Sequence, residues 1–486
     1  MNNESGFAEV TLGKENTGKR IYECLVEKGV YINAPCGGEG KCGKCKVRVL
    51  SGLTSGTPDI NGEVLACQAV VLSELELLVP LPAALDDKAS AKAVKTDGLT
   101  PDAEYSAALD VGTTTVALAL IDCGSGDITA VRTFENPQKA FGADVISRIS
   151  ACERDVNNLY LMQNALLDAL KDNIKDLGVS VGTLAVTGNT TMLHIFCGVS
   201  PVSLGKAPFT PVFTRMRELC GSELGLPVNK VTVLPSVSAY IGADVVCGVY
   251  STGMTGLDYP TLLTDIGTNG ESVLCTGTLQ GNRLYAVSAA AGPALEGAEI
   301  SCGMAGVAGA ISSFDESGFR TVLDAPPTGV CGAGLIDITA YLLESALLDE
   351  NGALESGSFK VAEGIILTEE DVRKIQLAKS AIRASLEALL SSCGIGFEDI
   401  ERLFLAGGMG YYMNVRSAGR IGLLPRHSNP TVTAVGNSAL AGAAKALACG
   451  GFEELNRIAE NCRTVELANS PVFAEEFIKN IRFPEQ

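Results

Sequence analysis

Four cysteines have a spacing that suits a metal centre. Cys36, Cys42 and Cys45 form the pattern C-x5-C-x2-C in one loop, and Cys67 follows 22 residues after Cys45. Four thiolates can hold either a zinc ion or an iron-sulfur cluster. Structural zinc sites usually combine two short cysteine pairs, whereas three of these cysteines crowd one loop and the fourth stands alone. The spacing therefore favours an iron-sulfur cluster.

The residues around this loop bear on the same prediction. Four glycines leave backbone N–H groups free to approach cluster sulfurs: Gly37, Gly38, Gly40 and Gly43. Four cations surround the cysteines: Lys41, Lys44, Lys46 and Arg48. We interpret the cations as a solvated face; the alternative is that they offset the cluster charge or contact an acidic partner.

A second candidate site lies in residues 109–122, LDVGTTTVALALID, where two apolar strands flank a turn of small residues. Gly112 lets the backbone approach a phosphate, and the hydroxyl residues after it supply donors: Thr113, Thr114 and Thr115. Asp110 can hold Mg²⁺ through water. The similar segment LLTDIGTNGESV, residues 262–273, indicates a duplicated fold. A P-loop is excluded, because the chain has no G-x-x-x-x-G-K-S/T motif.

The elements around the two sites divide the chain into three parts. Residues 1–80 predict a small domain of strands at 7–13, 44–50 and 74–79 with one helix at 19–28. Residues 81–105 are rich in Ala, Pro, Lys and Asp without periodicity, which predicts a flexible linker. Residues 106–486 alternate buried strands with helices, so we expect an α/β domain.

Composition limits the classes of partner. The chain has 486 residues and a formal net charge of -19, which argues against binding to nucleic acid or to an anionic membrane surface. The N-terminus lacks the features of a secretory signal and no apolar run approaches the length of a membrane span, so we expect a cytoplasmic protein with reduced thiols. The other twelve cysteines, together with His194 and His427, form no metal-binding pattern and are predicted to be mostly buried.

The cysteine segment resembles the 2Fe-2S ferredoxins over about residues 5 to 80, and it is most similar to the adrenodoxin-like C-x5-C-x2-C variant. The resemblance implies a β-grasp fold and a 2Fe-2S cluster bound by the four cysteines.

The remainder resembles the superfamily of acetate and sugar kinases, Hsp70 and actin, called ASKHA, whose motifs occur in the family's order. The resemblance implies a two-lobed domain that binds ATP and Mg²⁺ between its lobes. The second phosphate loop, TDIGTNGE, supplies Asp265, Gly267, Thr268, Asn269 and Gly270, and the adenosine motif LFLAGGMG supplies Gly407, Gly408 and Gly410.

The two connecting helices of the superfamily match residues 238–249, SAYIGADVVCGV, and residues 434–447, AVGNSALAGAAKAL, where Gly and Ala permit close crossing. The first segment lacks the Glu of Hsp70-like ATPases. Asp244 therefore remains there as a candidate to hold Mg²⁺ or orient water, beside Asp110 and Asp265.

A ferredoxin followed by such an ATPase resembles the reductive activators of corrinoid-dependent enzymes. Three segments carry this resemblance: GNTTMLHIFCGVSP, SAYIGADVVCGV and SAAAGPALEGAEI. The resemblance implies an enzyme that uses ATP to reduce the Co(II) form of a methyltransferase's corrinoid protein to Co(I), with electrons from an external donor. We also consider a homodimer formed through the ATPase domain. Longer members carry a middle domain before the ATPase; here the first phosphate loop follows the linker directly, so we expect that domain to be missing.

Three alternatives stay open at this point. One is a sugar or acid kinase with an appended redox-sensing ferredoxin. Another is an ATP-driven activator of radical dehydratases, which the ferredoxin motif argues against because such activators typically hold a 4Fe-4S cluster between subunits. The third is an ATP-gated scaffold without catalysis.

Overall fold

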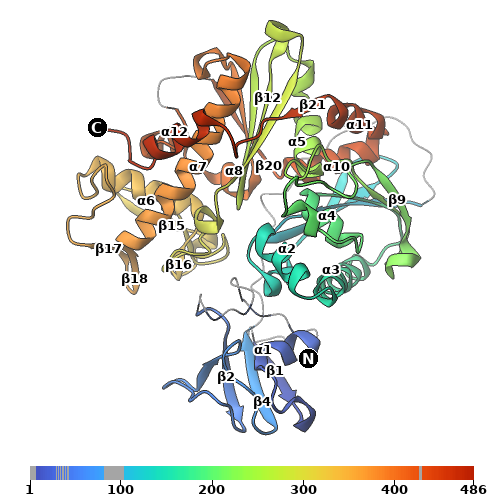
Figure 1. Cartoon of the computed structure of the whole chain (residues 1–486), viewed down its shortest axis with the longest axis vertical. Coiled ribbons are helices and arrows are strands. Elements are labelled where there is room, and N and C mark those ends of the chain that lie inside the picture. The colour runs from blue at the N-terminus through green and yellow to red at the C-terminus, as the bar shows by residue number, and fades with distance from the viewer. Residues whose placement is uncertain are drawn as a thin grey trace.

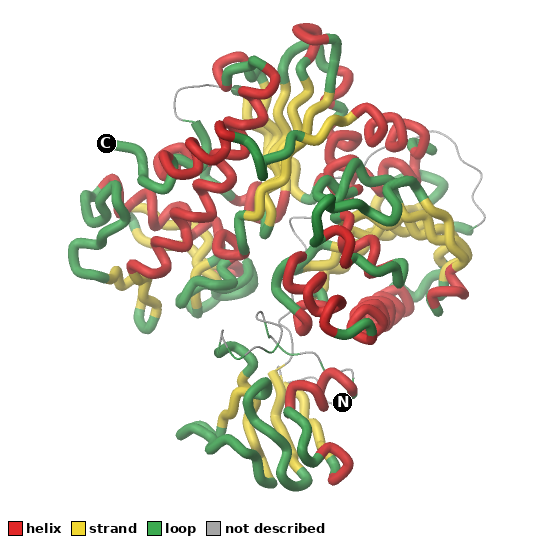
Figure 2. Tube along the Cα trace, viewed as in Figure 1, coloured by secondary structure: helices red, strands yellow, loops and turns green. Residues whose placement is uncertain are grey.

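The computed structural model describes residues 7–28, 30, 32, 34, 38, 40, 43–80, 103–425 and 430–485. It consists of a small N-terminal module and two larger lobes, with the module below the two lobes in Figure 1. Figure 2 shows that strands form the centre of each part and that helices cover them. The predicted linker, residues 81–105, lies outside the described residues except for its last three.

The N-terminal module is an antiparallel sheet with one helix, in the strand order β1-β4-β2-β3. Its elements are β1 (Phe7–Leu12), α1 (Ile21–Glu27), β2 (Lys46–Ser51), β3 (Glu63–Leu65) and β4 (Leu75–Pro80). Side chains from the helix and strands, among them Leu12, Leu25 and Leu77, form its apolar core. The three predicted strands and the predicted helix are present. The sequence did not predict β3, because three residues are too few to show alternation.

The first lobe is built on a six-stranded sheet in the order β7-β6-β5-β8-β10-β9. The strands are β5 (Tyr105–Val111), β6 (Thr115–Asp122), β7 (Ile128–Glu135), β8 (Val181–Gly188), β9 (Arg217–Cys220) and β10 (Val228–Val233). The helices before β10 are α2 (Val145–Arg154), α3 (Asn157–Asp176) and α4 (Thr190–Phe196), and the short 3-10 helix η3 (Pro137–Phe141) precedes α2.

The second lobe has a second six-stranded sheet, in the order β20-β19-β11-β12-β13-β21. Its strands are β11 (Thr261–Ile266), β12 (Asn269–Cys275), β13 (Leu284–Ala290), β19 (Arg402–Ala406), β20 (Thr431–Gly436) and β21 (Cys462–Thr464). The helices are α6 (Gly332–Glu344), α7 (Glu369–Cys393), α8 (Gly407–Tyr412), α9 (Val415–Ile421), α11 (Phe452–Asn461) and α12 (Pro471–Lys479), and the short 3-10 helix η8 is Pro293–Glu296. Two small sheets complete the lobe: β14 (Ala310–Asp315) with β15 (Gly318–Thr321) and β16 (Gly329–Val330), and β17 (Ser358–Ala362) with β18 (Ile365–Thr368).

The two large sheets repeat one topology. In each sheet a central strand, β5 or β11, pairs antiparallel with the next strand through a tight turn and parallel with a later strand on its other side. The order β7-β6-β5-β8-β10 thus corresponds to β13-β12-β11-β19-β20. Each predicted phosphate loop is the turn that follows the central strand. The predicted duplication of the fold is confirmed.

The connecting helices α5 (Ala243–Thr252) and α10 (Ser438–Cys449) pack closely against each other. A Cβ at Gly442 of α10 would lie 2.1 Å from the carbonyl oxygen of Cys247 in α5. Only a glycine lets the two backbones approach this closely. The crossing predicted from the Gly and Ala content of these two segments is therefore present.

Most cysteines outside the predicted cluster site are buried, and no disulfide joins any cysteine in the described part of the chain. No helix in that part combines the length and the apolar character needed to cross a bilayer.

Candidate nucleotide and cluster sites

The structure describes Gly38, Gly40 and residues 43–45 of the cysteine loop, together with Cys67. Cys45 and Cys67 are 1% and 4% exposed, and their sulfur atoms are 3.2 Å apart. Cys36 and Cys42 lie outside the described residues. The structure thus brings together the two predicted ligands that it describes, as free thiols rather than a disulfide.

The backbone of this loop requires glycine. Gly38, Gly40 and Gly43 have φ angles of 80°, 78° and 66°, which residues with a Cβ rarely adopt. The side-chain amide of Gln68, next to Cys67, donates a 3.3 Å hydrogen bond to the Gly40 carbonyl and so ties the loop to the fourth cysteine. A paired set of buried thiols beside a glycine-shaped loop fits an iron-sulfur cluster.

The first phosphate loop is the turn between β5 and β6. A Cβ at Gly112 would lie 2.3 Å from the Thr115 carbonyl oxygen, so the turn closes only around a glycine. The Thr113 hydroxyl accepts a 3.1 Å hydrogen bond from the Asn189 side chain, and its carbonyl accepts a 2.5 Å bond from Arg148. Arg148 is fully buried in α2. The buried Arg148 guanidinium therefore holds the loop in position.

The second phosphate loop is the turn between β11 and β12. Its backbone closes through a 3.0 Å hydrogen bond from the Gly267 N–H to the Asn269 carbonyl. Gly270 has a packing role, because its Cβ would lie 2.7 Å from Ile382 in α7. Packing against Ile382 is enough to explain why a glycine occupies this position. The predicted contact of Gly270 with the nucleotide stays a prediction.

Glu296 joins the two loops. Thr114 in the first loop and Thr268 in the second donate hydroxyl hydrogen bonds of 2.9 Å and 2.8 Å to the same carboxylate oxygen of Glu296. The Thr268 N–H donates a 3.0 Å bond to the other oxygen. Glu296 lies within one of the Gly/Ala-rich segments that resemble the corrinoid activators, but no role was predicted for it.

The three predicted acidic residues come together behind the loops. Burial raises the pKa of Asp110 to about 7, against a 2.7 Å hydrogen bond from Asn437 that lowers it. Burial also raises the pKa of Asp265 to about 7, and the Asp244 and Asp110 charges raise it further. Burial raises the pKa of Asp244 to about 6. The Asp244 charge contributes to the raised pKa of both Asp110 and Asp265, so these carboxylates lie close enough to repel one another.

Two more side chains belong to this group and were not predicted. Glu271 lies opposite Asp265 in the β11–β12 pairing, and burial together with the Asp244 and Asp265 charges raises its pKa well above the usual range. Asn437 caps the N-terminus of α10, where it accepts a 2.7 Å bond from the Leu440 N–H. In the described part of the chain, no three acidic, cysteine or histidine side chains are arranged to hold a metal ion by themselves.

The predicted adenosine motif, residues 403–410, spans the end of β19 and the start of α8. Gly407 has φ +82°, and a Cβ there would lie 2.5 Å from the Asp265 carboxylate. Gly408 is exposed, and no atom of the described residues comes within 4 Å of the position of its Cβ. The motif therefore lies against one of the acidic residues and leaves open space at Gly408.

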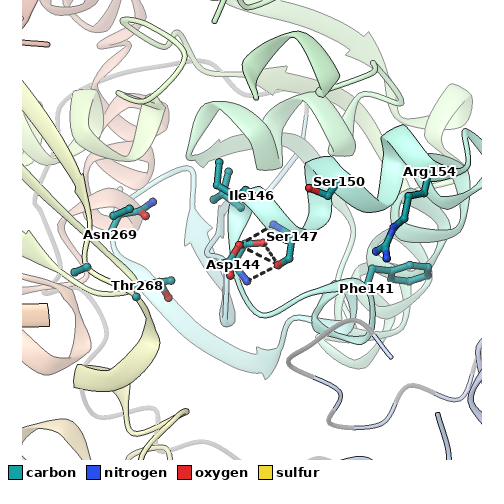
Figure 3. Close-up of a pocket in the computed structure, with 12 residues that line it drawn as sticks. Phe141, Asp144, Ile146, Ser147, Ser150, Arg154, Thr268 and Asn269 are labelled. Carbon is teal, nitrogen blue, oxygen red and sulfur yellow. Dashed lines mark hydrogen bonds between the residues drawn. The ribbon is translucent and has the colours of Figure 1, made fainter. Parts of the chain in front are cut away.

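A cavity of about 510 Å³ separates the lobes in front of the second phosphate loop. One wall comes from Thr268 and Asn269, and the other comes from α2 and the residue before it (Figure 3). On that second wall, Asp144 accepts 2.7 Å and 2.9 Å hydrogen bonds from the Ser147 backbone and hydroxyl. The adenosine-motif glycines do not line this cavity.

Three family models match the chain in order. A 2Fe-2S iron-sulfur cluster binding domain matches residues 10–72, the RACo middle region matches residues 105–256, and the C-terminal domain of RACo, described as the ASKHA domain, matches residues 259–486. The corrinoid activation enzyme RamQ of Eubacterium limosum is 33% identical over 422 residues, which cover 78% of this chain and 70% of that protein. The chain belongs to the RACo family. The fold class predicted from the sequence, a ferredoxin domain linked to an ASKHA domain, is therefore confirmed.

Two further comparisons agree with membership of the RACo family. A Methanosarcina barkeri protein named Co(II) methylated amine-specific corrinoid protein reductase is 29% identical over 379 residues, or 69% of this chain and 68% of its own length. A solved structure titled Reductive activator for corrinoid, iron-sulfur protein aligns with a TM-score of 0.72 at 28% identity, covering 98% of this chain and 96% of its own.

The expectation that the RACo middle domain is missing was wrong. The middle-region model matches residues 105–256, which contain the first phosphate loop and the whole sheet of the first lobe. The segment carries the first of the two similar loops, and its assignment to one ATPase domain, residues 106–486, stays a prediction. The two lobes of the duplicated fold are thus the middle and C-terminal regions of the RACo family.

Proposed function

We propose that this chain is an ATP-dependent reductive activator that transfers one electron to the Co(II) form of a corrinoid protein and converts it to Co(I). One observation carries the proposal: the chain aligns along nearly its whole length with a solved reductive activator. The ferredoxin module, both phosphate loops and the helix crossing all fall within that alignment.

ATP is proposed to bind between the lobes, with its phosphates on the two threonine loops and its adenosine beside Gly407 and Gly408. Asp110, Asp244 and Asp265 are the residues that would hold Mg²⁺ or its water ligands. Mg²⁺ in nucleotide sites usually combines one or two carboxylates with water and phosphate oxygens.

The cluster is proposed to be bound by Cys36, Cys42, Cys45 and Cys67 and, when present, supplies single electrons. Plant-type clusters have potentials near about -400 mV. Reduction of a corrinoid at a lower potential costs roughly 2.3 kcal/mol for each additional 100 mV. Binding energy from ATP can meet that cost, because a nucleotide that prefers one arrangement of the protein shifts the equilibrium toward it.

The proposed partners are the corrinoid protein of a methyltransferase system and an external electron donor, in the cytoplasm, and a second copy of the chain bound through the ATPase domain. The proposed domains are 1–80, 81–105 and 106–486. A linker of about 25 residues has a root-mean-square span of roughly 27 Å if flexible, which lets the module reach more than one partner.

The test compares the intact chain with a Cys67→Ser variant in anaerobic reduction of a Co(II) corrinoid protein, with ATP and an excess of reductant. The intact chain is expected to form Co(I), and the variant is expected to lose this activity while it still binds nucleotide. Equal rates would contradict electron transfer through the chain's own cluster.

The cavity in front of the second phosphate loop favours a second candidate, a small-molecule kinase with a redox-sensing module, because a kinase needs space for an acceptor beside the terminal phosphate. The carboxylate and hydroxyl groups of Asp144 and Ser147 line this space. Transfer of ³²P from ATP to a sugar or organic acid would support the kinase; hydrolysis alone would leave the activator as the function.

A further inference from the structure

The N-terminal module contacts the first lobe through α1. Val26 is only 7% exposed and packs with the apolar core of the first lobe rather than with the core of its own module. One turn earlier on α1, the Tyr22 hydroxyl donates a hydrogen bond to the carbonyl of Ala140 in η3. The α1 helix is therefore held against the first lobe by an apolar contact and a polar one.

The same module contacts the second lobe through its cysteine loop. The half-buried Lys44 ammonium donates a hydrogen bond to the Ala298 carbonyl. Lys44 directly precedes Cys45, one of the predicted cluster ligands. The module thus contacts both lobes, and its contact with the second lobe is made by the residue next to Cys45.

Ala298 lies two residues after Glu296, the residue that joins the phosphate loops. Between them, Gly297 has φ +81°, and a Cβ there would lie 2.5 Å from the Met304 carbonyl. Gly292, before η8, also has a positive φ of 76°. The segment 293–298 therefore makes both contacts: Glu296 binds the two phosphate loops, and Ala298 binds Lys44 of the module. Gly292 before it and Gly297 within it have positive φ angles.

The hydrogen-bond donors of the two phosphate loops cannot bind a phosphate while they are bound to the Glu296 carboxylate. The Thr268 N–H and the hydroxyls of Thr114 and Thr268 all point to the Glu296 carboxylate. A phosphate group needs such donors, and its charge has the same sign as that of a carboxylate. Phosphate binding on both loops therefore requires Glu296 to move away.

We propose that Glu296 couples the nucleotide site to the ferredoxin module: ATP displaces the Glu296 carboxylate, the segment 293–298 shifts, and Lys44 loses its acceptor at Ala298. This inference rests on the proposed function and adds its regulation. Without nucleotide, the module is held against both lobes; with nucleotide, it keeps only its contacts with the first lobe and is freer to move toward the corrinoid partner. By linkage, docking of the module must weaken nucleotide binding by the same factor.

The test measures module release and nucleotide affinity in the cluster-loaded full chain, without any corrinoid protein. Anaerobic small-angle scattering is expected to show a larger radius of gyration when a non-hydrolysable MgATP analogue is added. Lys44→Met is expected to give the larger radius without nucleotide and to tighten nucleotide binding about fivefold or more. The visible spectrum of the cluster reports that the module of each variant is folded.

Matched controls come from neighbouring charges. Lys46→Met removes a lysine that pairs with Glu63 inside the module at 3.2 Å, and Glu299→Gln alters an exposed carboxylate three residues after Glu296. Neither control is expected to change the radius or the affinity. In the Glu296→Gln background, Lys44→Met is expected to add nothing to nucleotide affinity, because the coupling residue is already lost.

Two results would overturn the coupling: a radius that does not respond to nucleotide, or Lys44→Met and Glu296→Gln effects on affinity that simply add. Either result can occur while Co(I) formation still depends on ATP, in which case the proposed function stands and the coupling fails. If Co(I) does not form but the radius still responds to nucleotide, the coupling stands and the proposed function fails.

Discussion

Asn437 donates a 2.7 Å hydrogen bond to the carboxylate of Asp110, although 327 residues separate them in sequence. Asn437 caps α10 in the C-terminal region, and Asp110 is the next-to-last residue of β5 in the middle region. The bond therefore joins the two regions of the family at the predicted Mg²⁺ site.

We predict that Asn437→Ala weakens MgADP binding about tenfold. Loss of the donor removes the interaction that opposes the raised pKa of Asp110, so the carboxylate is less ionised and less available to the metal. Titration calorimetry measures the change. Asn414→Ala is the matched control, because the Asn414 side chain also caps a helix, α9, through backbone N–H groups alone. Unchanged affinity in Asn437→Ala would contradict this role.

At the adenosine motif, Gly408→Val is expected to abolish nucleotide binding while it leaves the melting temperature of the nucleotide-free protein nearly unchanged. No atom of the described chain lies within 4 Å of the added Cβ, so the side chain fills only the space that we assign to adenosine. Gly407→Ala is less informative, since its Cβ would collide with Asp265. Normal nucleotide affinity in Gly408→Val would place the adenosine elsewhere.

For the cluster, Cys67→Ser is predicted to lose most of the 2Fe-2S absorption and the EPR signal of the reduced state. Cys24→Ser is the matched control, because Cys24 is equally buried in the module but belongs to the apolar core on α1. It is expected to keep a full cluster. Zinc without acid-labile sulfide in the wild-type protein would contradict the cluster assignment.

His194 gives a prediction for pH. Its Nε2 accepts a 3.1 Å hydrogen bond from the Val212 N–H, so the ring proton is on Nδ1, which lies 2.7 Å from the Thr190 carbonyl. Burial, with a smaller contribution from the Arg217 charge, lowers the pKa of His194 below its usual 6.5. The unfolded chain thus binds a proton at a pH where the folded chain does not.

The stability that His194 contributes is therefore complete above about pH 6.5 and is lost as the pH falls toward the lower folded pKa. The slope is at most about 1.4 kcal/mol per pH unit for one proton. Thermal unfolding of wild-type and His194→Gln proteins between pH 5.5 and 8 measures it. The difference in stability between the two proteins is expected to change with pH only below about pH 6.5. A difference that is constant from pH 5.5 to 8 would contradict the lowered pKa of His194.

The sequence predicted those parts of the sites that depend on local chain geometry. Gly112 is needed by the tight turn between β5 and β6. Cys36, Cys42 and Cys45 lie close together in the sequence, so their spacing is visible there. Asn437 and Glu296 act through contacts made across the fold. A helix-capping Asn and a Glu in a Gly/Ala-rich turn have many roles in proteins, so neither residue type indicated its partner.

The division of the chain into regions was also only partly predictable from the sequence. The duplicated strand-turn-strand pattern correctly indicated two related lobes. It gave no means to tell that the first lobe matches a separate family model, the RACo middle region, because the two lobes have the same strand-turn-strand pattern. The helix crossing at Gly442 was predictable, since small residues at helical spacing let two helix backbones come close together.

The most direct test of the account is the appearance of Co(I) in an anaerobic mixture of the cluster-loaded chain, reductant and a Co(II) corrinoid protein, followed by visible absorption with and without MgATP. We predict rapid formation of Co(I) with MgATP and little or none without it, with Asp265→Asn resembling the sample without nucleotide. Equal rates with and without MgATP would contradict the central claim that ATP drives the reduction.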